Sequence, residues 1–135
     1  MMLKDALGAY RGGIHETTRV IGMRPDSADA WNDRANARNC LGNFSEAVSD
    51  YTRALELGLR FREALTALGN RGLARIVLGD LDGAHDDFSE IILRKPTNKL
   101  LLRSAFVQRA SVKEKKGDSE GAAADRNMAV MLSVR

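Results

Sequence analysis

The chain has 135 residues, which is enough for one domain with a hydrophobic core of its own. Apolar residues make up 44% and charged residues 29% of the sequence, a balance that excludes an intrinsically disordered chain. The net charge of +3 comes from 21 basic and 18 acidic residues interleaved along the chain, so the clustered cations needed to bind nucleic acid are missing. Abundant Ala, Leu and long charged residues, with only two prolines, favour an all-α protein.

The sequence also carries information about the compartment. Cys40 is the single cysteine and cannot form an internal disulfide, so a reducing compartment is expected. The first residues include no apolar stretch of signal-peptide length. The longest aliphatic runs, 91–93 and 100–102, are far too short to span a bilayer. We therefore expect a cytoplasmic protein that does not enter a membrane.

Four short segments share one frame, and they begin at Gly8, Gly42, Gly79 and Gly117, which are 34, 37 and 38 residues apart. A glycine can end a helix in the left-handed conformation, and an Asn or Asp directly after it can cap the next helix. The residues after the last three glycines are of this type: Asn43, Asp80 and Asp118. The pattern predicts a helix–turn–helix bend that is repeated four times.

Helical periodicity flanks the bends. Before a bend, apolar and small residues lie three and four apart, as at Leu65, Leu68 and Gly72. After a bend, small and large apolar residues share one stripe, as in 84–92. Each of the two prolines, Pro25 and Pro96, closes a unit. The residues that follow the prolines are candidate caps for the next helix: Asp26, Ser27, Thr97 and Asn98.

This unit resembles the tetratricopeptide repeat, whose first helix carries a Trp, then Leu-Gly, then Tyr, and whose second helix carries an Ala, an aromatic residue and a closing Pro. The matching residues in three successive units are Trp31, Ala35, Ala47, Tyr51 and Ala54; Leu68, Gly72, Ala84, Phe88 and Pro96; and Phe106, Ala110, Ala122 and Ala129. Arg126 stands where the family has an aromatic residue. Two insertions, near 58–60 and 99–102, are each about one helical turn and predict lengthened first helices.

The resemblance implies an all-α fold, a right-handed superhelical solenoid of antiparallel helix pairs with about three and a half repeats in a single domain, 1–135. The repeats are a half repeat over 1–25, followed by 26–60, 61–97 and 98–135. Residues 1–7 are too few for a complete first helix, so a helix from about Tyr10 to Met23 is expected to lack a full partner.

Charged residues recur at positions that are apolar in the family. The first helices carry pairs of cations four residues apart, which share a helix face. The second helices carry an acid at one repeated position. The pairs are Arg34 and Arg38, Arg71 and Arg75, and Arg109 and Lys113, and the acids are Glu16, Asp50, Asp87 and Asp125. The shared period predicts a ladder of ion pairs between helices; an anion-binding stripe is the alternative.

The family's concave groove is lined by first helices, and helical phase then selects the residues that face it. In three successive repeats these are Asp29, Asn32, Asn36, Asn39 and Cys40; Thr66, Gly69, Leu73, Ile76 and Val77; and Ser104, Val107, Ser111, Glu114 and Lys115. Among them the three asparagines form one row of amides, which can pair with the backbone of an extended peptide. The alternative is that this row is only solvated.

Apolar residues lie beside the amide row. Leu73, Ile76 and Val77 could form an anchor pocket for a side chain of the peptide, or they could be buried under the third repeat or in a dimer. The predicted peptide-binding site consists of Asn32, Asn36, Asn39, Leu73, Ile76, Val77, Ser111 and Glu114.

No constellation for catalysis or metal binding is apparent in the sequence. His15 and His85 belong to different units and cannot hold one metal ion, and Cys40 has no histidine nearby to activate it. Phosphate-binding loops, dinucleotide fingerprints and nucleophile elbows are missing. We therefore expect no enzyme, no cofactor and no metal.

Two functions remain open. The first is a non-catalytic scaffold that binds an extended peptide or a segment of a partner protein in the groove. The second is a structural module that forms homo-oligomers, a homodimer being favoured, through ends that no polar helix caps.

Overall fold

A computed structural model of the chain describes residues 3–133, and it describes side chains from residue 6 onwards in that range. Over this range the chain forms seven α-helices and no β-strand. The helices are α1 (Leu3–Met23), α2 (Ala28–Cys40), α3 (Phe44–Leu57), α4 (Phe61–Val77), α5 (Leu81–Leu93), α6 (Lys99–Lys115) and α7 (Ser119–Ser133).

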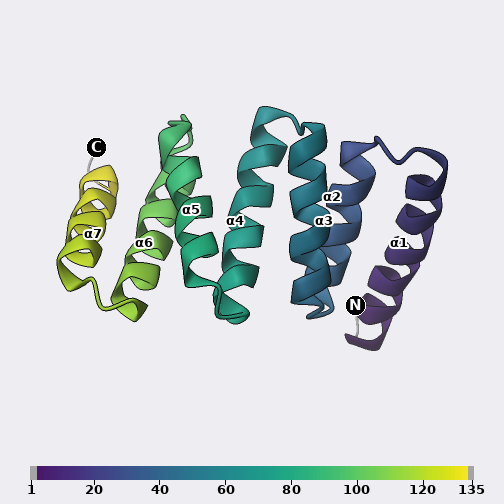
Figure 1. The fold of residues 1–135 in the computed structure, drawn as a ribbon, viewed down its shortest axis with the longest axis horizontal. Helices are drawn as coiled ribbons and strands as arrows, with labels where there is room; N and C mark the ends of the chain where they lie inside the picture. Colours follow the sequence, from purple (N-terminus) through teal and green to yellow (C-terminus); the bar gives the residue numbers. More distant parts are fainter. Residues whose placement is uncertain (1–2, 134–135) are drawn as a thin grey trace.

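The helices form one row, with α1 at one end and α7 at the other (Figure 1). Helices that follow one another in the chain pack side by side in antiparallel directions. The pairs α2/α3, α4/α5 and α6/α7 are tight hairpins, and α1 packs against α2. The predicted all-α solenoid of stacked antiparallel helices is therefore confirmed.

Three of the four predicted bends are present. Gly42, Gly79 and Gly117 have φ values of 81°, 81° and 86°, so each takes the left-handed conformation that ends a helix. Asp80 and Asp118 then cap the next helix, because their carboxylates accept hydrogen bonds from the backbone N–H groups of Gly83 and Gly121 at 3.0 and 2.9 Å.

The predicted cap at Asn43 is wrong, because its side chain makes no capping hydrogen bond. At Gly83 and Gly121 a Cβ would collide with the capping carboxylate. Glu46, and not glycine, holds the equivalent position after Asn43. Ser27 and Asn98 cap α2 and α6 as expected.

The predicted bend at Gly8 is also wrong. Helix α1 runs without interruption from Leu3 to Met23, and Gly8, Gly12 and Gly13 lie inside it with helical backbone conformations. The residues after Gly8 are Ala and Tyr, which offer no side-chain oxygen to cap a new helix. The helix expected from Tyr10 therefore begins seven residues earlier, at Leu3.

Both insertions lengthen first helices, as predicted. Helices α4 and α6 each have 17 residues, whereas α2 has 13. The extra turn comes at their N-terminal ends, and one edge of the array is extended there.

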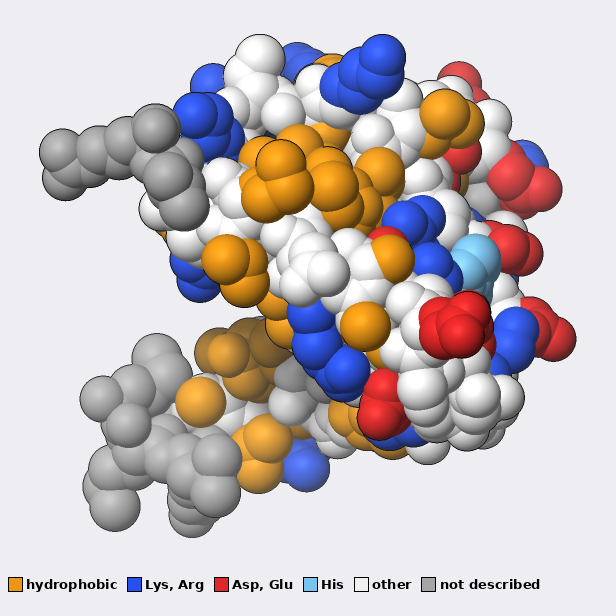
Figure 2. Space-filling model, turned by 90° about the vertical axis from the view of Figure 1, so that its left-hand side faces the viewer, with side chains coloured by type: hydrophobic (Ala, Val, Ile, Leu, Met, Phe, Trp, Pro, Cys, Tyr) orange, Lys and Arg blue, Asp and Glu red, His pale blue; other side chains and the backbone are white. Residues whose placement is uncertain are grey.

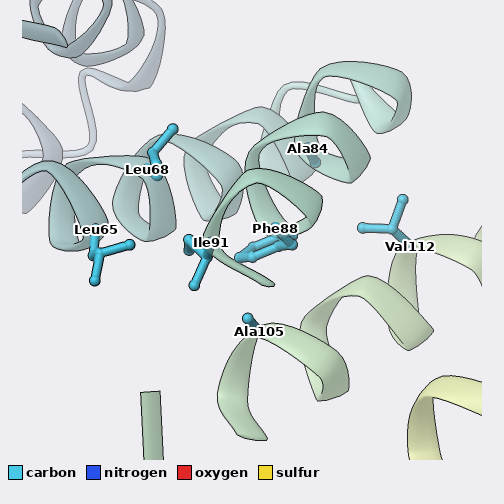
Figure 3. Close-up of a cluster of buried hydrophobic side chains, with 7 residues drawn as sticks. All are labelled: Leu65, Leu68, Ala84, Phe88, Ile91, Ala105 and Val112. Carbon is cyan, nitrogen blue, oxygen red and sulfur yellow. The ribbon is translucent and has the colours of Figure 1, made fainter. Parts of the chain in front are cut away.

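The core lies between the hairpins. Figure 3 shows Phe88 and Ile91 of α5 between residues of α4 and Ala105 of α6. A Cβ on Gly72 would lie 2.7 Å from Cζ of Phe88, so only glycine lets α4 and α5 approach this closely. Ala35 and Ala47 are fully buried in the first hairpin, and Ala110 and Ala122 in the last. The predicted close approach at small residues is confirmed.

Candidate functional site: the groove between α4 and α6

The charge ladder is the most regular polar feature of the array. In the first hairpin, Arg34 of α2 makes a two-point ion pair with Asp50 of α3, with Nε–Oδ2 and Nη2–Oδ1 distances of 2.9 Å. Arg38 adds a third hydrogen bond to the same carboxylate at 2.9 Å. The Asp50 side chain is only 2% exposed, so two cations compensate one buried anion. This pairing confirms the predicted structural ladder.

The other two hairpins repeat this geometry. Asp87 accepts hydrogen bonds from Arg71, the shortest at 2.6 Å, and from Arg75 at 3.0 Å. Asp125 is paired with Arg109 at 2.7 Å and with Lys113 at 3.0 Å. Burial alone raises the pKa of Asp125, but hydrogen bonds from Arg109 and Lys113 outweigh it and hold that pKa below its usual value.

The ladder also joins neighbouring hairpins, which the sequence analysis missed. The first arginine of each cation pair, here called the leading arginine, donates a hydrogen bond from Nη1 to a hydroxyl on the preceding helix at 3.1–3.2 Å. The pairs are Arg34 with Thr18, Arg71 with Thr52, and Arg109 with Ser89. Thr52 and Ser89 each lie two residues after the ladder acid of their helix, and Thr18 lies two residues after Glu16. The predicted ladder role of Glu16 is wrong, because Glu16 pairs with Arg19 on its own exposed face.

A groove opens between α4 and α6. A cavity of about 170 Å³ has an apolar floor and a polar rim. The floor includes Leu65, Phe88, Ile91, Leu101 and Ala105, and the rim includes Thr66, Asn70, Ser104 and Gln108. Gly69 and Leu73 complete the lining. Because Gly69 has no side chain, and a Cβ there would touch only Cδ1 of Ile91 at 3.8 Å, this position leaves the floor open.

The groove continues toward the extended edge of the array. An adjoining cavity of about 320 Å³ shares Leu65, Thr66 and Leu101 with the first and reaches Phe61 and Pro96. Phe61 is 53% exposed, which is unusual for a large aromatic side chain. The lengthened first turns of α4 and α6 therefore create the outer half of the groove.

An amide network borders the inner half. Asn36 of α2 accepts a hydrogen bond from the buried Tyr51 hydroxyl at 2.5 Å, and Asn70 approaches the same Asn36 oxygen at 3.5 Å. Burial raises the pKa of Tyr51 to about 12, so this phenol stays protonated and acts as a donor at neutral pH. The network links the first hairpin to a residue that lines the groove.

Comparisons with known proteins identify this architecture. Human tetratricopeptide repeat protein 13 is 30% identical over 104 residues, which cover 75% of this chain and 12% of that protein. Human tetratricopeptide repeat protein 36 is 39% identical over 91 residues, covering 64% of this chain and 48% of that protein. This chain is a tetratricopeptide repeat protein. It spans at most half the length of these relatives, and no family model matches it.

Solved structures show the same fold as this tetratricopeptide array. A crystal structure of MamA superposes with a TM-score of 0.80 over 91% of this chain and 63% of its own, at 20% identity. The crystal structure of BtubC from P. vanneervenii gives a TM-score of 0.76 over 89% of this chain and 54% of its own, at 18% identity.

Only one of the eight predicted site residues, Leu73, lies among the residues that line the α4/α6 groove. Asn36 is half-buried and is occupied by Tyr51. Asn32 and Asn39 are half-buried on α2, away from the cavity lining. The amide row of the tetratricopeptide array is therefore partly engaged in internal contacts, and its binding role stays a prediction.

The remaining predicted site residues differ in their burial and in their contacts. Ile76 packs against the core of the second hairpin, whereas Val77 is 63% exposed. Ser111 is half-buried, and Glu114 forms an exposed pair with Arg126 at 3.3 Å. Of the other residues nominated by helical phase, Thr66, Gly69 and Ser104 do line the groove.

Asn70 and Gln108 were missed by the sequence analysis. They stand at the same repeat position, one residue before the leading arginines Arg71 and Arg109. That shared register was the signal that could have found them. The sequence predicted that one face of each first helix borders the groove. In α4 the cavity is lined both by that face, with Thr66, Gly69 and Leu73, and by the adjacent position Asn70.

The described residues include neither a membrane-spanning helix nor a cluster of metal ligands. Within 3–133, no helix combines the length and apolar character needed to cross a bilayer. In the same part of the chain, no three His, Cys, Asp or Glu side chains gather as ligands for a metal ion.

Proposed function

We propose that this tetratricopeptide protein is a non-catalytic scaffold whose α4/α6 groove binds a short extended segment of a partner protein. The supporting observation is the cavity itself, with a floor of Leu65, Phe88 and Ile91 below a rim of hydroxyl and amide groups. An apolar side chain of the partner enters the cavity, and the rim groups hydrogen-bond its backbone.

The length of the groove limits the ligand. Phe61 and Leu73 are twelve residues apart on one helix, so the groove is about 18 Å long. An extended peptide advances about 3.3 Å per residue, so roughly five or six residues fit. The rim contributes one cation, Arg62, at the outer end. The preferred segment is therefore apolar at its centre, with an acidic residue toward Phe61.

Gly69 provides a matched pair of variants for the test. Gly69→Leu places a side chain in the cavity, whereas Gly69→Ala adds only a Cβ at ordinary contact distance from Ile91. Peptides are selected from a displayed library of random heptapeptides on the wild-type chain, and their affinities for both variants are measured by fluorescence polarisation. We expect Gly69→Ala to keep the affinity and Gly69→Leu to lose at least about tenfold. Equal affinity for Gly69→Leu would contradict the proposal.

A second function, assembly of copies through the ends of the array, is supported by apolar side chains that α7 exposes. Met128, Val130 and Met131 are 41%, 64% and 67% exposed. Sedimentation at several concentrations tests this function: an assembly that dissolves in Met131→Glu supports it, and a monomer at high micromolar concentration contradicts it.

We also place the scaffold in the cytoplasm as part of this proposal. Cys40 is an exposed free thiol, which a reducing compartment preserves. Fractionation of cells that express the full chain tests this placement, and recovery of the protein in a secreted fraction would contradict it.

A further inference from the structure

Each first helix carries the same stripe of three residues. The stripe has a small or apolar residue, an arginine four positions later, and a second small or apolar residue three positions after that. The three stripes are Ala30, Arg34 and Ala37 of α2; Ala67, Arg71 and Ala74 of α4; and Ala105, Arg109 and Val112 of α6. All six flanking residues are at most 9% exposed.

These stripes form the joints of the array. Ala67 packs in a cluster with Tyr51, and Ala105 packs in a cluster with Phe88 and Ile91 (Figure 3). The arginine of each stripe donates to Thr18, Thr52 or Ser89 on the preceding helix. One chemical pattern therefore attaches every hairpin to its predecessor.

The face formed by α6 and α7 occupies the position, one repeat later, of the surface onto which such a stripe packs. A cavity of about 410 Å³ is lined there by Arg103, Val107, Arg126, Ala129, Val130 and Ser133. Arg103, Val107, Arg126 and Ala129 stand 38 residues after Leu65, Gly69, Phe88 and Ile91, which line the groove against α6. Val107 and Val130 are 45% and 64% exposed, so within residues 6–133 no helix covers this face.

The hydrogen-bonding position of the joint is also present on α7. Thr52 and Ser89 each lie two residues after the ladder acid of their helix, and Asn127 lies two residues after Asp125. Asn127 is exposed, and its side-chain oxygen can accept a hydrogen bond from a guanidinium group. Figure 2 shows hydrophobic side chains gathered on this end of the molecule.

We propose that this face, the α7 seat of Val107, Asn127, Ala129 and Val130, binds a helix of another protein that carries the joint stripe. The two small or apolar residues of that helix pack on Val107, Ala129 and Val130, and the arginine between them donates to Asn127. A folded second copy of this chain offers no such helix, because its three stripes are buried in its own joints. This proposal does not rest on the α4/α6 groove.

Two substitutions distinguish the seat from the α4/α6 groove. Ala129 replaces the larger Ile91, and Arg126 replaces Phe88 and turns to pair with Glu114.

The probe for the test is a synthetic peptide of residues 61–78 of this chain, which contains the α4 stripe. It is held helical by a staple between positions 62 and 66, which are exposed in α4. The full chain is titrated with this peptide, and binding is followed by NMR shifts of the chain and by fluorescence polarisation. A peptide with Arg71→Met is the matched control.

We expect amide shifts confined to 103–107 and 126–133. Val130→Glu in the chain weakens binding at least about tenfold, since it places a charge on the apolar floor. Met23→Glu, at the opposite end of the array and 74% exposed, leaves binding unchanged. Asn127→Leu weakens the peptide with arginine but not the Arg71→Met peptide, because only the former makes the guanidinium bond.

Several results would overturn the proposal. These are no binding at millimolar peptide, unchanged binding to Val130→Glu, and shifts that map to the α4/α6 groove. Equal weakening of both peptides by Asn127→Leu would show that the peptide arginine does not hydrogen-bond Asn127. A dimer of the chain that Val130→Glu dissolves would show that a second copy covers the seat. Circular dichroism of each variant separates these results from loss of fold.

Discussion

Arg71 of α4 binds Asp87 of α5 at 2.6 Å and Thr52 of α3 at 3.1 Å, so one guanidinium group holds its own hairpin together and attaches it to the hairpin before. Both partners of the ion pair are largely removed from water, with the arginine 14% and the aspartate 2% exposed. Replacement of either residue is therefore expected to act on packing between hairpins as well as within one.

The first prediction concerns Arg71→Ala. This variant leaves the buried Asp87 carboxylate with Arg75 alone, so we expect a loss of about 3 kcal/mol in the free energy of unfolding, at the low end for a broken buried pair. Arg53→Ala is the matched control, because Arg53 is 49% exposed and pairs weakly with Glu56, so its loss stays under about 1 kcal/mol. Urea unfolding measures both. Similar losses for the two variants would remove the structural role of the ladder.

The second prediction concerns the hydroxyl at a joint. Thr52→Val keeps the shape of the side chain but removes the acceptor for Arg71, so we expect a loss of about 1.5 kcal/mol, as for a hydrogen bond to a charged group. Thr17→Val is the control, because the Thr17 hydroxyl bonds only to backbone carbonyls of its own helix. Thermal unfolding compares them, and equal melting temperatures would show that the joint does not depend on this bond.

The third prediction contrasts two glycines of α4. Gly72→Ala places a Cβ 2.7 Å from the Phe88 ring, so α4 and α5 must separate, and we expect a loss of about 1–3 kcal/mol from overpacking. Gly69→Ala has room for its Cβ and gains helix propensity, so it is expected to stabilise the chain by up to about 1 kcal/mol. Urea unfolding of the two variants decides this, and a stabilising Gly72→Ala would contradict the packing described here.

The fourth prediction is a pH dependence centred on Asp125. Burial raises the pKa of this carboxyl, but Arg109 and Lys113 outweigh it, so the folded pKa lies below the unfolded one. Its contribution to stability is therefore present above the unfolded pKa, about 3.9, and is lost as the pH falls from there through the folded pKa.

Asp125→Asn removes this titration. We expect the variant to be less stable than the wild type at pH 7, and we expect the difference to shrink as the pH falls below about 4. Urea unfolding across this range measures it. Parallel stability curves for the two proteins would show that Asp125 does not contribute to acid unfolding.

Much of the fold followed from periodic residues. Gly42, Gly79 and Gly117 mark bends because each is followed by a residue that starts a helix, and the ladder was predictable because Arg71 and Asp87 recur with one period. Gly8 has the same residue type but no capping residue after it, and the helix continues through it. A glycine alone therefore does not decide between a bend and a helix interior.

The site was harder to predict than the fold. The groove depends on which side chains fill the space between α4 and α6, and this is set by Phe88 and Ile91 of a third helix, α5. The helical periodicity of the sequence predicted Asn36 on the concave side. It could not show that the Tyr51 hydroxyl already donates a hydrogen bond to the Asn36 side-chain oxygen. Ile76 has the phase of a groove residue, yet it packs on the core of its own hairpin.

We propose that the α4/α6 groove holds an apolar side chain of a partner segment. Methyl NMR of the full chain with a peptide from the heptapeptide selection tests it most directly. We expect shifts, and contacts to the apolar side chain of the peptide, at the methyl groups of Leu65, Leu73, Leu101 and Ala105, with none of these effects in Gly69→Leu. Contacts confined to Val48, Leu55 or other residues outside the groove would contradict it.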